Sequence, residues 1–414
     1  MHAPSLPRWL IPRLPFFYGW IIVVCTCCAG LSRQGGAVAT LSIFVAPMTH
    51  HFGWSRTALS GAVSLGGVLA ALLAPTLGRF LDRSGARLVL CLAVLTTGVA
   101  GMLLSLTNSL LMFYLLFCAA RTNFAAAFDL GIYGAVNNWF VARRTLANAL
   151  ATVAQFAGLV VLPLIAAAAI ARDGWRAGWL AVGIAVLVIG FIPNFLFMVR
   201  RPEDLDLSPD RAIRPHVARR SRLEPSFTRA QALGTPSFWL LCLFTLLAYP
   251  VQAGVSLHQA PYYIECGITP TVAAAIVSTF SLTSGFASLV CGLMPRSLPI
   301  RYALVLTGLA LSAGTFAMLD IATPRDGYLA AAIFGIGIGG LLTLPPIAWA
   351  DYYGRASYGA IRGIALSVQV LAQASGPLLS GILRDWSGSY VLSLQCFLTL
   401  SCLSVMAALL ARPP

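Results

Sequence analysis

The sequence predicts an all-α membrane protein with twelve transmembrane helices in two pseudo-symmetric six-helix bundles. Three observations lead to this prediction. Hydrophobic residues make up 58% of the chain and charged residues only 10%, whereas a soluble domain usually has about 25% charged residues. Long stretches contain no charged residue at all. The chain also repeats itself over more than a hundred residues, far longer than the unit of a solenoid.

The charge-free stretches are long enough to cross a bilayer. A helix needs about 20 apolar residues to do so, and glycines, prolines and charges divide the chain into twelve such segments. The expected limits are 17–44, 54–77, 87–107, 110–137, 146–170, 176–199, 237–262, 270–292, 301–320, 327–350, 360–382 and 388–410.

The repeat has an offset of 214 positions and contains no gap over residues 46–163, so that Gly53, for example, falls on Gly267. In an apolar chain, such a repeat indicates two membrane-embedded halves with a substrate site between them. We therefore expect residues 1–199 and 235–414 to form the two bundles. Polar intramembrane residues that break the repeat are candidates for the substrate site.

The polar segment 200–234 is rich in arginine and proline, and it is expected to be a cytoplasmic linker between the bundles. All 27 basic residues are arginines, and the net charge is +14. If both termini are cytoplasmic, twenty arginines fall at inner ends and only five at outer ends. This bias predicts that orientation in a bacterial inner membrane by the positive-inside rule. It makes the lipid bilayer, and not nucleic acid, the partner of the positive charge.

The sequence contains no arrangement of residues typical of enzymes or metal sites. The cysteines at 25–28 have no histidine or carboxylate near them in the sequence and lie in the first span, so they are expected to act as small hydrophobic residues. We find no nucleophile–base set and no nucleotide-binding loop. The chain is therefore not expected to be an enzyme or to bind a cofactor or a metal. The N-terminus has no cleavable signal pattern.

The connection between the second and third spans carries a distinctive mixture of glycine and charge. Its glycines supply unusual backbone angles, and its arginines hold it in the cytoplasm. Asp82 is expected to lie against the N-terminus of a neighbouring helix or to pair with Arg143 or Arg144. The residues that we expect to act as a conformational loop are Gly78, Asp82, Arg83, Gly85 and Arg87.

This connection resembles the signature loop of the major facilitator superfamily at every key position. The twelve spans and the central linker agree with that family, and the resemblance covers essentially the whole chain. It implies the major facilitator fold. The matching connection of the second half, residues 292–296, has lost most of the pattern, which is common in the superfamily.

Further motifs resemble those of the monocarboxylate and oxalate/formate transporter branch, in its bacterial form. They are Tyr18-Gly19-Trp20, Phe52-Gly53-Trp54-Ser55-Arg56, Trp139-Phe140 with Arg143-Arg144, His258-Gln259-Ala260-Pro261-Tyr262, and Gly359-Ala360-Ile361-Arg362-Gly363 with Gly376-Pro377. The branch implies transport of small organic carboxylates by proton symport or anion exchange. One departure is that the eighth span, 272–293, contains no charge, and Arg362 lies near the cytoplasmic end of the eleventh. The cationic site of those relatives therefore cannot be transferred.

Two arginines lie inside predicted spans, Arg33 in the first and Arg121 in the fourth. A charge there costs about 2.5–3.5 kcal/mol on insertion scales, so it normally faces a cavity or a partner. The repeat offset places Leu247 and Gly335 at the equivalent positions, so neither arginine is required by the architecture. Because a guanidinium forms paired hydrogen bonds with a carboxylate, we expect both arginines to bind a substrate anion.

Two titratable residues are candidates for proton coupling. Asp129 lies two turns after Arg121, and its repeat equivalent is Thr343. It is either a proton carrier or a permanent counter-ion of one arginine, and the sequence does not decide between these roles. His258 lies close to Pro261 near the outer end of the seventh span, and histidine titrates near physiological pH. It is a candidate for both coupling and substrate binding, and the alternative is a structural histidine.

Tyr133 and Gln252 are further candidates for hydrogen bonds to the substrate. Gln155 and Gln369 are equivalent in the repeat, so we interpret both as packing residues. The sequence thus predicts a secondary active transporter that moves a small organic anion, specifically a monocarboxylate, together with protons. Alternating access and function as a monomer are expected.

Two other functions remain open. A proton-coupled exporter of amphipathic compounds would also carry an arginine in its fourth span. In such exporters a glycine follows closely, whereas Thr122 and Asn123 follow here, which weakens that interpretation. A membrane receptor or sensor that transports nothing is the alternative from another functional class.

Overall fold

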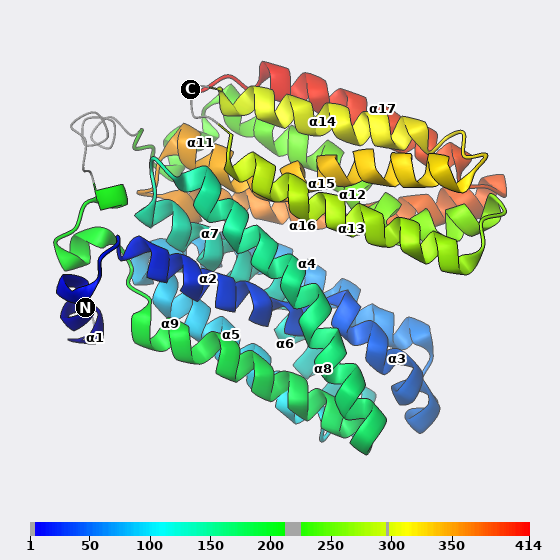
Figure 1. Cartoon of the computed structure of the whole chain (residues 1–414), viewed down its shortest axis with the longest axis horizontal. Helices are drawn as coiled ribbons and strands as arrows, with labels where there is room; N and C mark the ends of the chain where they lie inside the picture. The colour runs from blue at the N-terminus through cyan, green and yellow to red at the C-terminus, as the bar shows by residue number, and fades with distance from the viewer. Residues whose placement is uncertain (1–4, 212–224, 295–297) are drawn as a thin grey trace. The chain divides into compact units, whose positions relative to one another are not determined.

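The computed structural model describes residues 5–211, 225–294 and 298–414, and these are almost entirely helical (Figure 1). Part of the expected linker, residues 212–224, and part of the degraded connection, residues 295–297, lie outside the described residues. Within the described ranges no strand is present, and eleven helical segments are long and apolar enough to cross a membrane. The predicted all-α membrane fold is confirmed.

The helices follow one another along the chain with short interruptions. They are α1 (Ser5–Leu10), α2 (Gly19–Arg33), η2 (Gln34–Gly36), α3 (Val38–Phe52), α4 (Arg56–Ser84), α5 (Ala86–Leu104), α6 (Leu110–Thr122), η3 (Asn123–Ala127), α7 (Phe128–Trp139), α8 (Arg144–Val186), η4 (Leu187–Phe191), α9 (Ile192–Phe197), α11 (Arg229–Leu233), α12 (Pro236–Glu265), α13 (Pro270–Gly292), α14 (Ile300–Ala317), α15 (Pro324–Tyr353), α16 (Tyr358–Ser387) and α17 (Val391–Leu410).

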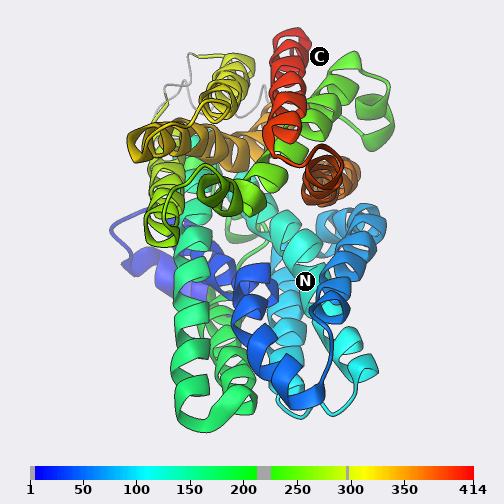
Figure 2. The ribbon, with the colours of Figure 1, turned by 90° about the vertical axis from the view of Figure 1, so that its right-hand side faces the viewer.

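One of the eleven segments contains two of the twelve expected spans. Helix α8 continues through η4 and α9, and the whole stretch has 54 residues. At a rise of 1.5 Å per residue that would measure about 80 Å, far more than one bilayer. The backbone breaks at Gly174, whose φ of +80° is not helical, and the chain reverses there into a hairpin (Figures 1 and 2). The expected connection between spans five and six thus forms at this glycine.

The first span is interrupted, which the sequence pattern did not predict. Helix α2 ends at Arg33, a 3₁₀ turn follows, and Ala37 is extended before α3 begins. Gly36 explains part of this break, because a Cβ on it would lie 2.5 Å from the carbonyl oxygen of Ala120. Only glycine allows the two backbones to approach so closely.

The connection between the second and third spans is shorter than expected. Helix α4 continues to Ser84, so Gly78 and Asp82 are helical, and only Gly85 separates α4 from α5. Gly85 has a φ of +83°, which favours glycine. Gly78 has a different role, because a Cβ there would lie 1.9 Å from the carbonyl oxygen of Gly359. The expectation that both glycines supply unusual angles is therefore wrong for Gly78.

The chain divides into two compact units, which are described separately. Unit 1 comprises Met1–Ser226 and Tyr353–Ser367, and unit 2 comprises Phe227–Tyr352 and Val368–Pro414. In unit 1, α8 packs against α2 and α5. Glycine permits the second contact, since a Cβ on Gly183 would lie 2.6 Å from the backbone nitrogen of Met102.

In unit 2, α17 packs against α14 and α12, and Figure 1 shows α14 and α17 side by side. Helix α15 carries four closely spaced glycines. A Cβ on Gly335 or Gly339 would collide with residues of α13, and one on Gly337 or Gly340 would collide with residues of α14. These small residues let α15 pack tightly between two neighbours, as is common in membrane helices.

Candidate functional site

Breaks in helical geometry position the two intramembrane arginines of unit 1. Arg33 is the last residue of α2, directly before the 3₁₀ turn η2. Arg121 lies in the last turn of α6, directly before the π-helical segment η3. π-helical segments occur frequently at functional sites, and irregular backbone at membrane depth is tolerated where protein or a cavity surrounds it. Both arginines therefore extend from local irregularities.

The two guanidinium groups share one aromatic ring. The Cζ atom of Arg33 lies 4.7 Å from the ring centroid of Phe124, and that of Arg121 lies 4.4 Å from it. The two Cζ atoms are therefore no more than 9.1 Å apart, the sum of these distances. Each arginine gains a cation–π contact, and the ring keeps the two like charges close together.

The two arginines differ in how fully their donors are used. Arg33 donates from Nε to the carbonyl oxygen of Phe124 at 2.9 Å and from Nη1 to the side-chain oxygen of Gln155. Arg121 makes one long hydrogen bond, from Nη1 to the carbonyl oxygen of Gly36 at 3.4 Å. Its Nε is buried and has no hydrogen-bond partner among the described residues. The Nε donor of Arg121 is thus available to a ligand.

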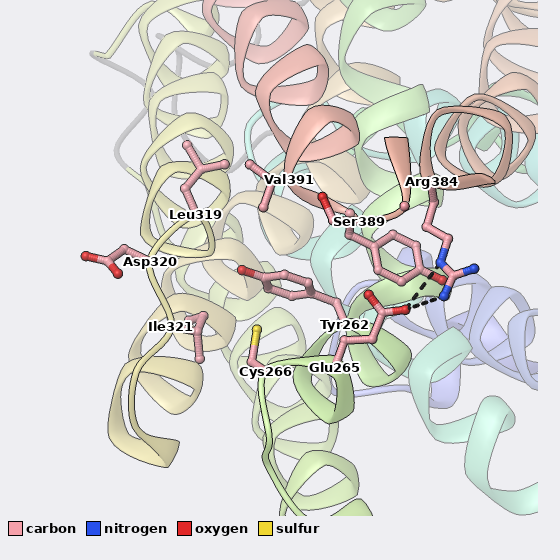
Figure 3. A pocket seen from close by; sticks show the side chains of 11 residues that line it. Tyr262, Glu265, Cys266, Leu319, Asp320, Ile321, Arg384, Ser389 and Val391 are labelled. Carbon is pink, nitrogen blue, oxygen red and sulfur yellow. Dashed lines mark hydrogen bonds and ion pairs between the residues drawn. The ribbon is translucent and has the colours of Figure 1, made fainter. Parts of the chain in front are cut away.

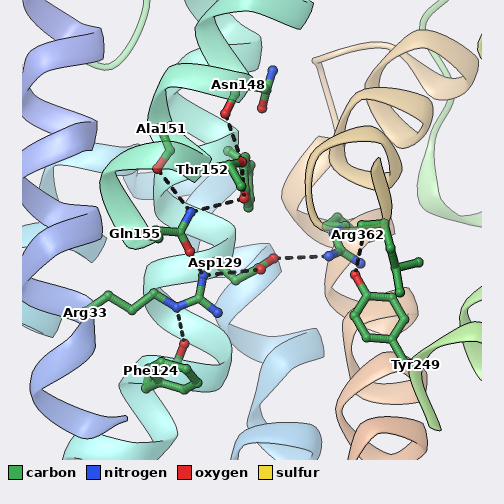
Figure 4. A network of polar contacts seen from close by, with 11 residues as sticks. Arg33, Phe124, Asp129, Asn148, Ala151, Thr152, Gln155, Tyr249 and Arg362 are labelled. Carbon is green, nitrogen blue, oxygen red and sulfur yellow. Dashed lines mark hydrogen bonds and ion pairs between the residues drawn. The ribbon is translucent and has the colours of Figure 1, made fainter. Parts of the chain in front are cut away.

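Asp129, in the first turn of α7, is buried and lies between two guanidinium groups (Figure 4). Its Oδ1 lies 3.2 Å from Nη2 of Arg362, and its Oδ2 lies 3.8 Å from Nη1 of Arg33. Arg362, on the first turns of α16, is 1% exposed. Asp129 thus pairs with Arg33 and Arg362, and Arg33 shares the ring of Phe124 with Arg121. We call these four residues the arginine cluster: Arg33, Arg121, Arg362 and Asp129.

A chain of hydrogen bonds supports the cluster from the side of α8 (Figure 4). Gln155 donates from Nε2 to the hydroxyl oxygen of Tyr133 at 3.1 Å, and that oxygen lies 3.0 Å from the hydroxyl of Thr152. Because Gln155 also accepts from Arg33, its amide is oriented at both ends. Gln155 was expected only to pack, but here it holds a cluster arginine in place.

The second acidic residue singled out in the sequence, Asp82, lies against a helix N-terminus, which is the first of the two arrangements expected for it. Its two carboxylate oxygens accept from the backbone nitrogens of Gly359 and Ala360 at 2.8 and 2.7 Å. These are unpaired donors in the first turn of α16, where a negative charge is favourable. Arg200 donates to the carbonyl oxygen of Asp82 at 2.5 Å. This arrangement ties α4 to the start of α16 within unit 1.

The remaining residues of the expected conformational loop have separate environments. Arg83 is exposed and has no hydrogen-bond or ion-pair partner among the described residues. Arg87 donates from Nε and Nη2 to the carbonyl oxygen of Phe195 at 3.1 and 2.7 Å. That carbonyl belongs to the last turns of α9, where such groups need partners outside the helix.

The other two candidates, Gln252 and His258, lie in unit 2 on α12. Gln252 accepts from the side-chain nitrogen of Gln373 at 3.1 Å. The Nε2 atom of His258 lies 3.2 Å from the carbonyl oxygen of Pro377, so it must carry a hydrogen. Its Nδ1 lies 3.2 Å from the hydroxyl of Tyr390. Burial raises the pKa of Tyr390, so this hydroxyl keeps its proton and is available as a donor.

A cavity of about 570 Å³ lies beside this histidine contact in unit 2 (Figure 3). Tyr262, Glu265, Arg384 and Tyr390 are among its lining residues, and Arg384 donates to Glu265 at 2.8 and 3.3 Å. The structure therefore brings Arg33, Arg121, Asp129 and Tyr133 together in unit 1 and places the other two candidates in unit 2.

Arg362 is the site residue that the sequence interpretation missed, because it was counted among the arginines at cytoplasmic ends. A signal for it was present. The repeat offset places Asn148 at the equivalent position, so Arg362 breaks the repeat as the other cluster members do. Among the described residues, no group of three or more histidine, cysteine or acidic side chains is arranged to hold a metal ion.

Comparison with known proteins gives a consistent result. The profile of the Major Facilitator Superfamily matches residues 22–377. The chain is 25% identical to monocarboxylate transporter 11 of Mus musculus, with 90% of this chain and 83% of that protein covered. It is 27% identical to the membrane sensor protein UhpC of Salmonella typhimurium, with 74% and 72% covered.

Two solved structures share the fold. One is the proton:xylose symporter XylE, with a TM-score of 0.73, 13% identity and 94% of each chain covered. The other is the human organic anion transporter MFSD10, with a TM-score of 0.68, 15% identity and 99% of this chain and 100% of that chain covered.

Proposed function

Since this chain belongs to the Major Facilitator Superfamily, we propose that it is a secondary active transporter for a small organic anion, specifically a monocarboxylate, driven by protons. The observation that carries the proposal is the arginine cluster, with three buried or half-buried guanidinium groups and one carboxylate. Within this set, three guanidinium groups stand against one carboxylate. A surplus of this kind at membrane depth is costly, and a bound anion would relieve it.

Arg121 is the residue that we assign to first contact with the substrate. Its Nε is desolvated without a partner, and a buried unsatisfied donor costs about 1–3 kcal/mol. A carboxylate can accept two parallel hydrogen bonds from one guanidinium. The aromatic ring of Phe124 would remain beneath the guanidinium and hold it in plane. Similarity to monocarboxylate transporters supports a carboxylate as the anion.

Asp129 supplies the coupling to protons in this proposal. When ionised, it holds Arg33 and Arg362 through the two ion pairs. A proton from the outer solution neutralises its carboxylate and releases both guanidinium groups. The substrate carboxylate then takes its place as their counter-ion, so that one proton and one anion enter together. Loss of the proton on the inner side restores the ion pairs and expels the anion. The counter-ion role is then the resting half of the proton cycle.

The other assigned residues support this cycle. Tyr133, positioned by Gln155, would donate to the substrate or to Asp129 once the ion pairs open. His258 and Gln252, which lie in unit 2, are further candidates for substrate contacts, and His258 is a second candidate for proton transfer. The contacts of Asp82 with the start of α16 would act as a latch that breaks and re-forms during the cycle.

The remaining parts of the proposal concern the whole protein. We propose that residues 1–199 and 235–414 form two bundles joined by the linker 200–234, and that these rock about the site in alternating access. The transporter would act as a monomer in a bacterial inner membrane with both termini cytoplasmic, as the arginine bias favours.

A second candidate function is that of a membrane sensor that detects an anion without transporting it. Similarity to the membrane sensor protein UhpC favours it. The arginine cluster would then be the recognition site, and the bound state would be read out by another protein. This candidate shares the binding site of the first and differs from it only in transport.

One experiment separates these functions. Purified protein in proteoliposomes is given radiolabelled pyruvate, lactate, formate or oxalate, with and without an inward proton gradient. Gradient-driven accumulation of a monocarboxylate, with no competition from its neutral amide, is the expected result. Binding of a carboxylate in a thermal-shift assay without any uptake or exchange would favour the sensor. Competition by lipophilic cations alone, with no effect of carboxylates at any pH, would contradict the anion site and favour an exporter.

A further inference from the structure

A second cavity in unit 1, separate from the arginine cluster, has a volume of about 590 Å³. It lies between α5 on one side and η4 and α9 on the other, and three arginines line it together with leucines and phenylalanines. We propose that this cavity binds an anionic phospholipid, with the phosphate on the arginines and an acyl chain along the apolar wall. None of the four residues of the arginine cluster lines it.

The charged end of the cavity suits a phosphate group. Arg83, Arg87 and Arg200 line it, opposed by the single carboxylate of Asp204. Arg87 and Arg200 are oriented by their hydrogen bonds to the carbonyl oxygens of Phe195 and Asp82. Arg83 has no partner among the described residues, so all of its donors remain available to a ligand.

The apolar end of the cavity suits a hydrocarbon chain. Leu88, Leu92 and Leu95 lie along one face of α5 at helical spacing, and Phe191 and Phe195 stand one turn apart on the opposite wall. Leu92 is 44% exposed and Phe195 is 49% exposed. From Leu88 to Leu95 the helix rises by about 10 Å, which matches the upper half of an acyl chain.

Charge decides the class of lipid. Three arginines against one carboxylate leave two positive charges in the cavity wall, which a zwitterionic phosphatidylcholine would not neutralise. Basic pockets between membrane helices on the cytoplasmic side are suited to acidic headgroups. The arginines lie where the positive-inside rule places the cytoplasmic face. The charge separation along the cavity, basic at one end and apolar at the other, matches a membrane lipid better than a small soluble anion.

The test uses purified, delipidated full-length protein and native mass spectrometry with dioleoyl phosphatidylglycerol or dioleoyl phosphatidylcholine. We expect one tightly retained phosphatidylglycerol and no equivalent retention of phosphatidylcholine. Each arginine near an anionic surface contributes about 1 kcal/mol, so Arg83→Gln should weaken retention about five-fold. The double variant Arg83→Gln/Arg87→Gln should weaken it about 30-fold. Arg83→Gln removes no protein contact and so should leave the fold intact.

The matched control is Arg301→Gln. Arg301 lies in the first turn of α14, is the repeat equivalent of Arg87, and does not line the cavity. It should leave retention unchanged. Leu92→Trp, which fills the apolar end, should weaken retention of phosphatidylglycerol with all arginines in place.

Three outcomes would overturn the proposal. They are equal retention of the two lipids, equal effects of Arg83→Gln and Arg301→Gln, and displacement of phosphatidylglycerol by inorganic phosphate at a comparable concentration. The last would identify a site for free anions that does not need a lipid chain.

Discussion

Asp129→Asn should destabilise the protein strongly in the absence of substrate. The substitution keeps the shape of the side chain but removes the negative charge that lies 3.2 Å from Arg362 and 3.8 Å from Arg33. Arg362 is 1% exposed, so its charge would remain buried without its carboxylate. Removing one partner of a buried ion pair typically costs about 3–5 kcal/mol. Arg33 should add less, because it keeps its bonds to Phe124 and Gln155.

The assay is thermal unfolding in detergent, followed with a thiol-reactive dye. Several cysteines are buried, Cys25 and Cys118 among them, so dye labelling reports loss of the fold. A loss of about 3–5 kcal/mol corresponds to a fall in the midpoint on the order of 10 °C for a unit of this size. The control is Asp385→Asn, which removes an 81% exposed carboxylate beside Arg384. Exposed pairs contribute about 0–1 kcal/mol, so its midpoint should barely move.

A double variant tests the cause. Asp129→Asn/Arg362→Met removes both charges of the closer pair, and replacing a whole buried pair by apolar groups is often neutral. It should recover most of the lost stability. If Asp129→Asn is as stable as the wild type, or if the second substitution recovers nothing, the ion pairs do not carry the stability that we assign to them.

The same variant reports on coupling. In the wild type, the carboxylate of Asp129 competes with the substrate carboxylate for two guanidinium groups. Asp129→Asn removes this competitor and the acid that the proposal couples to proton movement. Uphill, pH-driven accumulation should disappear while counterflow exchange continues. Unchanged accumulation would exclude Asp129 from the mechanism.

Three further predictions concern other parts of the chain. Arg121→Lys keeps the charge but loses the planar fork, so carboxylate binding, measured by thermal shift or calorimetry, should weaken by about 1.5–3 kcal/mol, or roughly 10- to 150-fold; an unchanged affinity would move the anion elsewhere. Asp82→Asn weakens the charged contacts with the backbone of Gly359 and Ala360, so the transport rate should fall while ligand affinity stays within several-fold; loss of binding in a folded variant would contradict the latch. His216→Cys, in an otherwise cysteine-free variant, should resist an impermeant thiol reagent on right-side-out cells, and ready labelling would reverse the proposed orientation; position 216 lies in the part of the linker outside the described residues.

Much of the fold could be predicted because its determinants are local and repeated. The limits of the later spans agree with the helices to within a few residues, since glycine, proline and charge mark their ends. The interruption after Arg33 could not be predicted in this way. It depends on the close approach of Gly36 to the backbone of Ala120, a contact between residues far apart in the sequence. A glycine within an apolar stretch does not show whether it will bend the chain or only pack.

The site was predicted less completely for a similar reason. Arg33, Arg121 and Asp129 could be proposed from the sequence because a charge within an apolar span is easily recognised. Arg362 lies near the start of its span, where an arginine is ordinarily explained by topology. Asp129, with which it forms an ion pair, is 233 positions away in the sequence. Sequence position alone cannot separate an arginine that anchors a helix end from one that is buried against a carboxylate.

The repeat offers a criterion that position does not. All four members of the arginine cluster lack a charged equivalent 214 positions away, where the chain carries leucine, glycine, threonine and asparagine. By contrast, the glutamines at 155 and 369 are equivalent, yet Gln155 bonds to Arg33. A residue that both halves share can therefore still support a site whose charged residues occur in only one half. The charged cluster residues are those without an equivalent in the other half. A residue that does have an equivalent, such as Gln155, can still hold a cluster residue in place. The asymmetric charges are accordingly the positions at which substitutions should change substrate and coupling first.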